Sequence, residues 1–545
     1  MTASPIFGGR PREFEVTAGQ LIWGLLVAIF AGIRLAGLLS LPVGGVELDS
    51  LAGAWQANAG NADDRFIPTL FQALTSWTFV ATTSEFPARI LAFAASCSIP
   101  FALWRLRPAL GEMGAMAALL ALAIDPFAVI LGATAWTGAF DMAIVLWLIV
   151  MAREEGLPAW SYAIAGFVTA TAGPIVLPAV IGVAAVRLVQ QDYPPGTRLL
   201  WAAGGAVLGG LIAATGFGTG FQDPVLPPIL AFTRGFDADW SSASSGSLFA
   251  FYGYPMLALG LLAALYHAYE CWRDETWPPE SVFVFAIWGL SAAWLALSWG
   301  TNSPVPFAAV SIPSALLIGR VAPAVARAFG DVAWLHAGPA VGGFTFLALV
   351  AGAFVIDWSR VGRVGDDQEK LIVIGLSIAM LAFAGLLLSA RRTAPALIAP
   401  FIAAGLLLAI SGSANVAFGG PTEPLPSPIS DVQGREIRDI ALNTRTEQGG
   451  LIVIHSDFKD ESTWAMRDSG TIVYASRVPP DATVVVWPVT LPAPDRFAVV
   501  EGQWSFEEIR KGPDGDFLDY LRWLTNRNSL KNSTLPVAVY LRTTQ

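Results

Sequence analysis

The sequence predicts a polytopic α-helical membrane protein that ends in a small α/β domain. Of its 545 residues, 54% are hydrophobic and only 14% are charged, and the mean hydropathy is +0.57. Soluble domains carry about 25% charged residues. The apolar residues form repeated blocks of about 20 residues, the helix length that crosses the hydrocarbon core of a bilayer. The composition then changes to ordinary polarity near Gly412, which predicts a separate soluble part.

The apolar blocks predict about 13 transmembrane helices. In chain order they are Ala18–Ser40, Phe86–Leu106, Gly111–Phe127, Thr137–Met151, Ala159–Ala172, Pro174–Val189, Leu199–Phe217, Ser247–His267, Ser281–Trp299, Pro304–Ile318, Val332–Ile356, Leu371–Ala390 and Ala394–Ser411. Residues 1–17 would be a cytoplasmic N-terminus, and residues 18–411 the transmembrane domain with a first outer loop over 41–85.

The arginines beside these blocks predict the orientation. With a cytoplasmic N-terminus, Arg10, Arg105, Arg153, Arg391 and most other arginines near the spans lie inside, as the positive-inside rule requires. An odd number of spans then places the C-terminus outside. We therefore expect a multi-pass protein of the cell membrane whose first outer loop and C-terminal domain share the extracytoplasmic side.

The region after the last span divides into a linker and a folded domain. Residues 412–430 are rich in Gly, Pro and Ser, which is typical of a linker. Within 431–545, residues 434–445 and 516–527 predict helices. Short β-branched runs predict strands at 451–457, 471–476, 482–489, 497–502 and 535–542. Helices alternating with strands predict an extracytoplasmic α/β domain.

Several function classes are disfavoured by the same sequence. The net charge of −10 does not support nucleic-acid binding, which needs a basic face. Cys97 and Cys271 are far apart and suggest neither a disulfide framework nor a metal cluster. A Walker loop and a dinucleotide fingerprint are both absent, which argues against a cytoplasmic nucleotide-sugar donor. The spans show no matched pair of broken helices, which argues against a transporter.

The stretch Val46–Leu70 carries the strongest candidate chemistry. Glu47 and Asp49 follow the first span in a sequence where charges are scarce. On a turn or at a helix start, both carboxylates could reach one hydroxyl or one ion, so either a general base or a divalent metal site is open. The structural alternative is a solvated loop in which Asp49 or Ser50 caps a following helix.

The stretches GGVELDSLAGAW, RFIPTLFQAL, FPARILAFAAS and GAFDMAIVLW resemble motifs of the GT-C superfamily, which are integral membrane glycosyltransferases that use polyprenyl-phosphate sugars. The resemblance implies that Asp49 is the catalytic base or a metal-side carboxylate with Glu47 as its neighbour. It also implies that Arg89 lies near the lipid-linked phosphate and that Asp141 is a second acidic position. The chain lacks a histidine directly before Pro68 and an arginine shortly before Asp141, as members often have, so a member without activity stays open.

The other charged candidates keep two interpretations each. Arg89 forms a local ion pair with Glu85 four residues earlier, or contacts the donor phosphate. Asp141 is either functional or hydrated at the outer interface. Arg34 is expected to extend toward the outer surface. Three further cations either bind the donor phosphate or are solvated beside lipid head groups: Arg234, Arg360 and Arg363.

The sequence thus predicts a hexosyltransferase that moves a sugar from a polyprenyl phosphate to an acceptor on the extracytoplasmic side. Asp49, Glu47 and Asp141 are the candidate catalytic residues, and Glu47 with Asp49 could hold Mg²⁺ or Mn²⁺. The expected partners are the lipid-linked sugar, membrane lipids and other membrane proteins, with no nucleic acid. The alternative is a non-catalytic GT-C-like protein that assists lipid-linked sugar transport or forms a structural subunit of an envelope complex.

Overall fold

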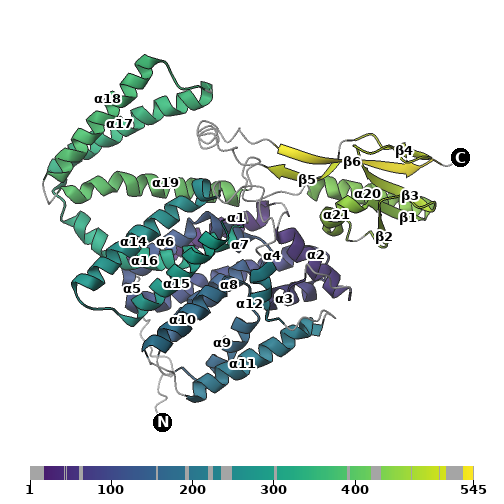
Figure 1. Ribbon diagram of the computed structural model, residues 1–545, viewed down its shortest axis with the longest axis horizontal. Coiled ribbons are helices and arrows are strands. Elements are labelled where there is room, and N and C mark those ends of the chain that lie inside the picture. The colour runs from purple at the N-terminus through teal and green to yellow at the C-terminus, as the bar shows by residue number, and fades with distance from the viewer. Residues whose placement is uncertain are drawn as a thin grey trace, which may run out of the picture.

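The protein is described by a computed structural model, in which a helical body carries a small mixed sheet at one end (Figure 1). The described residues are 17–543 apart from 42, 44–45, 61–65, 155–156, 191–195, 219–224, 235–247, 300–302, 362, 390–392, 419–430, 468, 503 and 511–531. The predicted helix at 516–527 lies outside them.

Each predicted span overlaps a helix of the body. These helices are α1 (Ala18–Ser40), α4 (Phe86–Cys97), α5 (Ile99–Leu110), α6 (Glu112–Ala123), α7 (Pro126–Ala133), α8 (Gly138–Arg153), α9 (Ala159–Ala170), α10 (Val176–Gln190), α11 (Gly196–Ala214), α14 (Tyr254–Arg273), α15 (Pro279–Leu297), α16 (Val305–Gly330), α17 (Trp334–Val361), α18 (Asp367–Leu388) and α19 (Ile398–Ala417).

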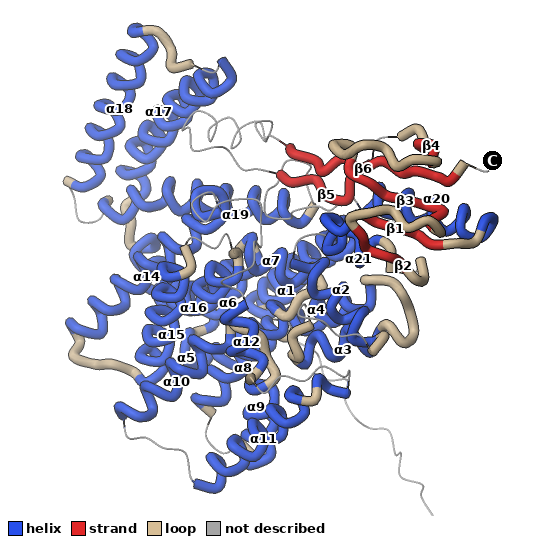
Figure 2. Tube along the Cα trace, turned by 45° about the vertical axis from the view of Figure 1, so that its right-hand side comes forward, coloured by secondary structure: helices blue, strands red, loops and turns tan. Residues whose placement is uncertain are grey.

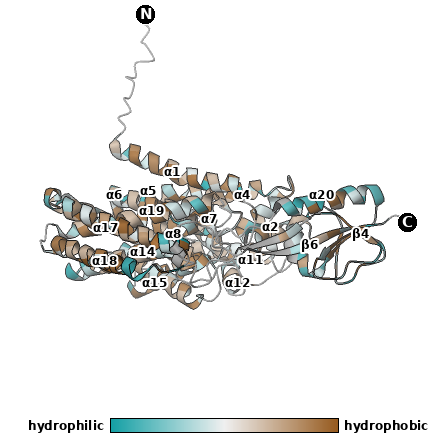
Figure 3. Ribbon diagram, turned by 90° about the horizontal axis from the view of Figure 1, so that it is seen from above, coloured by the Kyte–Doolittle hydropathy of each residue, from teal (hydrophilic) through white to brown (hydrophobic). Residues whose placement is uncertain are grey.

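The number of full spans is smaller than the number of apolar blocks. Among the described residues, eight helical segments are long and apolar enough to cross a membrane, or nine if the bent pair α6–α7 forms one span. The helices α9 and α10 are apolar but shorter. Figure 3 shows apolar residues along the outside of the helical body, and hydrophilic residues on α20 (Asp431–Gln448) beside the sheet. The chain is therefore a multi-pass membrane protein.

The main core lies where α1, α5–α8, α10 and α14–α16 meet, and its members include Phe127, Leu146 and Phe307. Phe127 and Phe307 stack with their ring centroids 4.9 Å apart. By contrast, α17 and α18 form a hairpin that lies to one side of this body in Figures 1 and 2. The predicted first outer loop contains two helices, α2 (Val46–Asn58) and α3 (Leu70–Thr78).

Arg34 shows that the body contains a buried charge that the sequence did not predict. The expectation that Arg34 extends outward is wrong, because its side chain is 0% exposed. Pro126 has no backbone N–H, so the carbonyl of Leu122 loses its helical partner where α6 and α7 meet at a bend of 69°. The Nη2 of Arg34 donates to that carbonyl at 3.0 Å, and Arg34 thus satisfies a backbone group that lipid could not.

The C-terminal domain is built on a six-stranded mixed sheet. Its strands are β1 (Leu451–His455), β2 (Ile472–Ala475), β3 (Ala482–Pro488), β4 (Phe497–Val499), β5 (Trp504–Arg510) and β6 (Asn532–Arg542). The order is β2-β1-β3-β6-β4, with β5 also paired to β6. β2 and β3 run parallel to β1, whereas β3, β4 and β5 pair with β6 antiparallel.

The helix α20 covers one face of this sheet. Its buried residues Ile437 and Ala441 share a core with Ile452, Val484 and Val539. Strand β5 was not predicted, because WSFEEIR places charged residues next to each other instead of alternating apolar and polar residues. The other strands and α20 match the predicted segments in position and type.

Small residues let α9 and α11 approach closely. A Cβ added at Gly205 would lie 1.9 Å from the carbonyl oxygen of Ala163, whereas one added at Gly204 would meet nothing within 4 Å. Membrane helices often associate through such small residues.

We expect Gly205→Ala to destabilise the protein by about 1–3 kcal/mol, since the added methyl group forces the two backbones apart. Thermal unfolding in detergent measures the change. Gly204→Ala is the matched control and should leave the transition unchanged or raise it slightly, because alanine is the better helix former. Equal losses from both variants would contradict the packing argument.

Candidate functional site

Glu47 and Arg89 form a buried bidentate ion pair between α2 and α4. The Nε of Arg89 donates to Oε1 of Glu47 at 2.6 Å, and Nη2 donates to Oε2 at 2.6 Å. The two residues are 2% and 4% exposed. The predicted pairing of Arg89 with Glu85 is not the one seen, because the carboxylate of Glu85 lies 3.6 Å from Arg435 instead.

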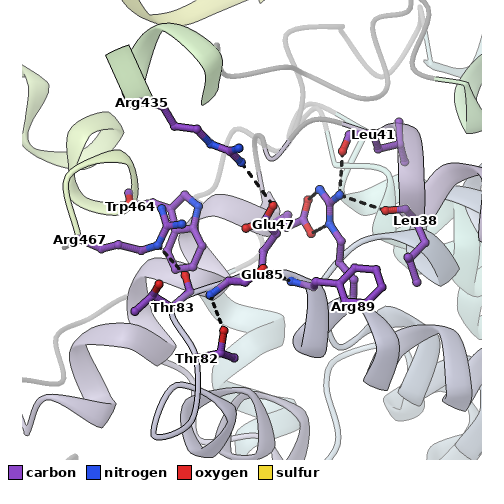
Figure 4. A network of polar contacts seen from close by, with 12 residues as sticks. Leu38, Leu41, Glu47, Thr82, Thr83, Glu85, Arg89, Arg435, Trp464 and Arg467 are labelled. Atoms are coloured by element: carbon purple, nitrogen blue, oxygen red, sulfur yellow. Dashed lines mark hydrogen bonds and ion pairs between the residues drawn. The ribbon is translucent and has the colours of Figure 1, made fainter. Parts of the chain in front are cut away.

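This pair ties four parts of the chain together. The remaining nitrogen of Arg89, Nη1, donates to the carbonyls of Leu38 and Leu41, where α1 ends. The Oε1 of Glu47 also accepts from the backbone N–H of Ala135, between α7 and α8. Figure 4 shows the guanidinium facing both the carboxylate and these carbonyls. The pair therefore positions the start of α2 on the membrane helices.

Asp49 lies on the other side of α2 from Glu47. Helix α2 begins at Val46, so both acids are in its first turn. The structural alternative, in which Asp49 or Ser50 caps a helix that starts after it, is therefore wrong. Residues two apart on a helix point about 200° apart. Glu47 accordingly faces the core while Asp49 is exposed. A carboxylate in the first turn is also favoured by the helix dipole.

This divergence bears on the predicted metal. Both oxygens of Glu47 already accept hydrogen bonds from a guanidinium or an amide, and Asp49 points away from them. The described residues hold no group of three or more His, Cys, Asp or Glu that could bind an ion. The residues present therefore do not fit a divalent cation shared by Glu47 and Asp49.

Asp141 is buried in α8 and does not meet Asp49. It is 0% exposed, so it is not hydrated at the interface. Its Oδ1 accepts from the hydroxyl of Thr137 at 3.0 Å and from the N–H of Gly173 at 2.7 Å. Its Oδ2 accepts from the N–H of Ile175 at 3.3 Å. A Cβ at Gly173 would lie 2.5 Å from Oδ2, so this approach requires glycine.

Glu47 and Asp141 thus hold the same turn between α7 and α8, one at Ala135 and the other at Thr137. Asp141 also fixes the turn between α9 and α10, where the carbonyl of Thr171 accepts from the N–H of Leu70 at the start of α3. The two buried acids hold α2 and α3 on the body. We call this end of the helical body, with α2, α3 and the sheet, the sheet face.

The remaining predicted phosphate ligands come from two separate parts of the chain, the end of α12 and the end of α17. Arg234 ends α12 (Pro227–Arg234), which packs on α9 and α10, and its side chain lies outside the described atoms. Arg360 and Arg363 are exposed at the end of α17. That hairpin lies far from α2 in Figures 1 and 2, so the structure does not bring these two arginines to Asp49.

The C-terminal domain is docked on α2 through α21 (Lys459–Ala465). Trp464 is 1% exposed and lies in the same apolar cluster as Leu48, Leu51 and Phe79. Its ring centroid is 5.5 Å from that of Phe79. The first outer loop and the C-terminal domain therefore share one face, as predicted.

Two arginines flank this tryptophan (Figure 4). Arg467 lies 3.9 Å over the Trp464 ring and donates from Nε to the carbonyl of Thr83 at 2.8 Å. Arg435 lies 3.6 Å from Glu85. These docking residues were not predicted, since a tryptophan in a short polar helix, KDESTWA, is typical of local packing and does not reveal its partner.

We expect Glu47→Gln and Arg89→Met each to destabilise the protein by about 3–5 kcal/mol, because each leaves the other charge buried without a partner. The double variant should lose clearly less than the sum. Thermal unfolding of the three variants forms the cycle. Lys370→Met removes an exposed i,i+3 pair with Asp367 and should have no measurable effect. Additive losses would show that the pair is not coupled.

Trp464→Ala should release the C-terminal domain from α2 while leaving its sheet core folded. Hydrogen exchange of α2 and of residues 79–85 would then rise, whereas exchange in β3 would not. Val489→Ala alters an exposed apolar residue of the same domain and is the control. Unchanged protection of α2 in the tryptophan variant would contradict the docking described here.

The fold also occurs in proteins of known structure. No family model and no curated protein sequence matches the chain. Two crystal structures of ArnT from Cupriavidus metallidurans do match in fold, each at 13% sequence identity. The structure bound to undecaprenyl phosphate has a TM-score of 0.55 and covers 97% of this chain and 99% of its own. The apo structure has a TM-score of 0.52 and covers 97% and 100%.

The likeness extends over the transmembrane helices and the C-terminal sheet together. At this sequence identity it concerns the arrangement of the chain and not its chemistry. The protein therefore has the fold of ArnT.

Proposed function

We propose that the chain is a membrane glycosyltransferase that moves a sugar from a polyprenyl phosphate to an acceptor hydroxyl on the sheet face. The main support is the position of Asp49. Its carboxylate is exposed on α2, and the other side of this helix is held by the buried Glu47–Arg89 pair and by Trp464. The fold supports the donor class, since ArnT of the same fold was crystallised with undecaprenyl phosphate.

In the proposed reaction, the acceptor oxygen attacks the anomeric carbon of the sugar. The bond from that carbon to the phosphate oxygen breaks, and polyprenyl phosphate leaves. Asp49 takes the proton of the acceptor hydroxyl as the new bond forms. A rigid α2 serves this step, because a general base acts only when it lies within hydrogen-bond reach of the proton.

The buried acids take a different role from the one the resemblance implied. We assign Glu47, Asp141 and Arg89 to positioning, since their charged atoms are directed at protein groups. The donor phosphate then needs another cation, whose contacts would strengthen as charge develops on the leaving group. We favour Arg234 over Arg360 and Arg363 on the distant hairpin. Its helix, α12, packs on α9 and α10, which are joined by the turn that Asp141 holds.

The second candidate is a non-catalytic protein of the same fold that assists lipid-linked sugar transport or supports an envelope complex. The specific observation in its favour is that Glu47, Arg89 and Asp141 all serve the packing of the chain. It differs from the first candidate in one respect that can be measured. Its function would not depend on the carboxylate of Asp49.

Asp49→Asn should lower sugar transfer by about 10²–10⁴-fold, the range for loss of a general base. Transfer is measured with purified protein and a set of polyprenyl-phosphate sugars. Asp367→Asn changes an exposed acid in the first turn of α18 and is the matched control. Equal rates for Asp49→Asn and the parent would reject the assignment and favour the second candidate.

A further inference from the structure

A pocket lies at the end of the helical body opposite the sheet face. It has a volume of about 270 Å³ and is lined by Arg105, Leu106, Pro108, Val150, Arg153 and Glu154. These residues come from the last turns of α5 and α8 and the residue after α8. Arg89 of the sheet face and Arg105 of the pocket lie toward opposite ends of the apolar helical segment Phe86–Leu110, which is long enough to cross a membrane. The pocket and the candidate site therefore lie on opposite faces of the membrane.

The two arginines of this pocket keep donors available. Arg105 uses Nε and Nη2 on Oε1 of Glu154, at 2.8 and 2.6 Å. The Nε of Arg153 lies 3.4 Å from Glu280, which is a long contact. Among the described residues, Nη1 of Arg105 and both terminal nitrogens of Arg153 have no hydrogen-bond partner.

Neither arginine is needed to cap the helices that end here. Arg320 donates to the carbonyl of Ala109 at 2.6 Å near the end of α5. Arg187 donates to the carbonyl of Ala152 near the end of α8. Because these two arginines already donate to carbonyls at the helix ends, the unused N–H donors of Arg105 and Arg153 remain available to a ligand in the pocket.

The pocket lies at the level of the lipid head groups. Exposed aromatic residues gather at the same ends of the neighbouring helices: Trp160, Trp201, Trp272 and Trp277. Such aromatic belts mark the membrane–water interface. The lining joins cationic groups to the apolar side chains of Leu106, Pro108 and Val150, which suits a molecule with an anionic head and an apolar body.

We propose that this pocket binds the phosphate of an anionic phospholipid head group from the leaflet opposite the sheet face. Arginine forks match phosphate oxygens and form charge-assisted hydrogen bonds with them. Basic pockets between transmembrane helices are known to select anionic head groups. Glu154 competes with the lipid phosphate for Arg105. The preference for anionic over zwitterionic lipids therefore depends on the additional charge of Arg153.

The test uses the full chain in nanodiscs of mixed phosphatidylglycerol and phosphatidylcholine, with the lipids retained after detergent extraction measured by native mass spectrometry. The parent should retain phosphatidylglycerol preferentially. In the Arg105→Ala/Arg153→Ala variant, the ratio of retained phosphatidylglycerol to phosphatidylcholine should fall about tenfold. Arg198→Ala, which changes an arginine stacked on Tyr162 of the same face, should lose none.

Glu154→Gln separates lipid binding from a structural ion pair. If the pocket binds an anion, removing the competing carboxylate increases retention of phosphatidylglycerol. If Glu154 and Arg105 only hold α5 to α8, this variant behaves like the arginine variant or leaves retention unchanged, and the proposal is wrong.

Inorganic phosphate distinguishes a lipid from a soluble anion. In lipid-free detergent, millimolar phosphate that stabilises the parent without any preference for phosphatidylglycerol would overturn the lipid assignment. Retention of the two lipids in equal amounts by the parent would overturn it as well. Neither result bears on transfer at Asp49, because that site lies on the other face.

Discussion

The buried ion pair between Glu47 and Arg89 is the interaction on which the arrangement of the sheet face depends. A desolvated charge is costly, and a pair of them is tolerated only when the geometry is good and the remaining polar atoms are satisfied. Here both conditions hold, because every nitrogen of the guanidinium donates to Glu47 or to the carbonyls that end α1. Since each partner needs the other, α1, α2, α4 and the turn before α8 are held in one arrangement.

Other buried ionisable side chains of the helical body are also paired with protein groups, here with the backbone. Arg34 donates to the carbonyls of Leu122 and Ala128 on either side of the bend between α6 and α7. Asp141 accepts from two backbone N–H groups between α9 and α10. In each case an ionisable group serves backbone atoms that a proline or a turn has left without helical partners. Lipid offers no hydrogen bonds, so irregular backbone at membrane depth must be satisfied by protein.

Two acids that look alike in the sequence, Glu47 and Asp49, have different surroundings in the structure. Glu47 and Asp49 are two residues apart, yet one is buried against Arg89 and the other is exposed. The helical period explains the difference, because a shift of two positions turns a side chain from the core to the opposite side. The buried Glu47–Arg89 pair fixes the position of α2 and thereby the position of Asp49. The C-terminal domain also holds α2 in place, since Trp464, which is distant in sequence, packs against Leu48 and Leu51 of the same helix.

The sequence by itself determined the multi-pass helical architecture, the position of most strands, and the placement of the first loop and the C-terminal domain on one side. These follow from block length, alternation and charge bias, which are local properties that the bilayer and the sheet impose on each segment. Only the tertiary structure decided the partner of Arg89, the burial of Arg34 and the docking of Trp464. Those contacts join residues far apart in the chain, and an isolated charge or tryptophan carries no local sign of which distant group will satisfy it.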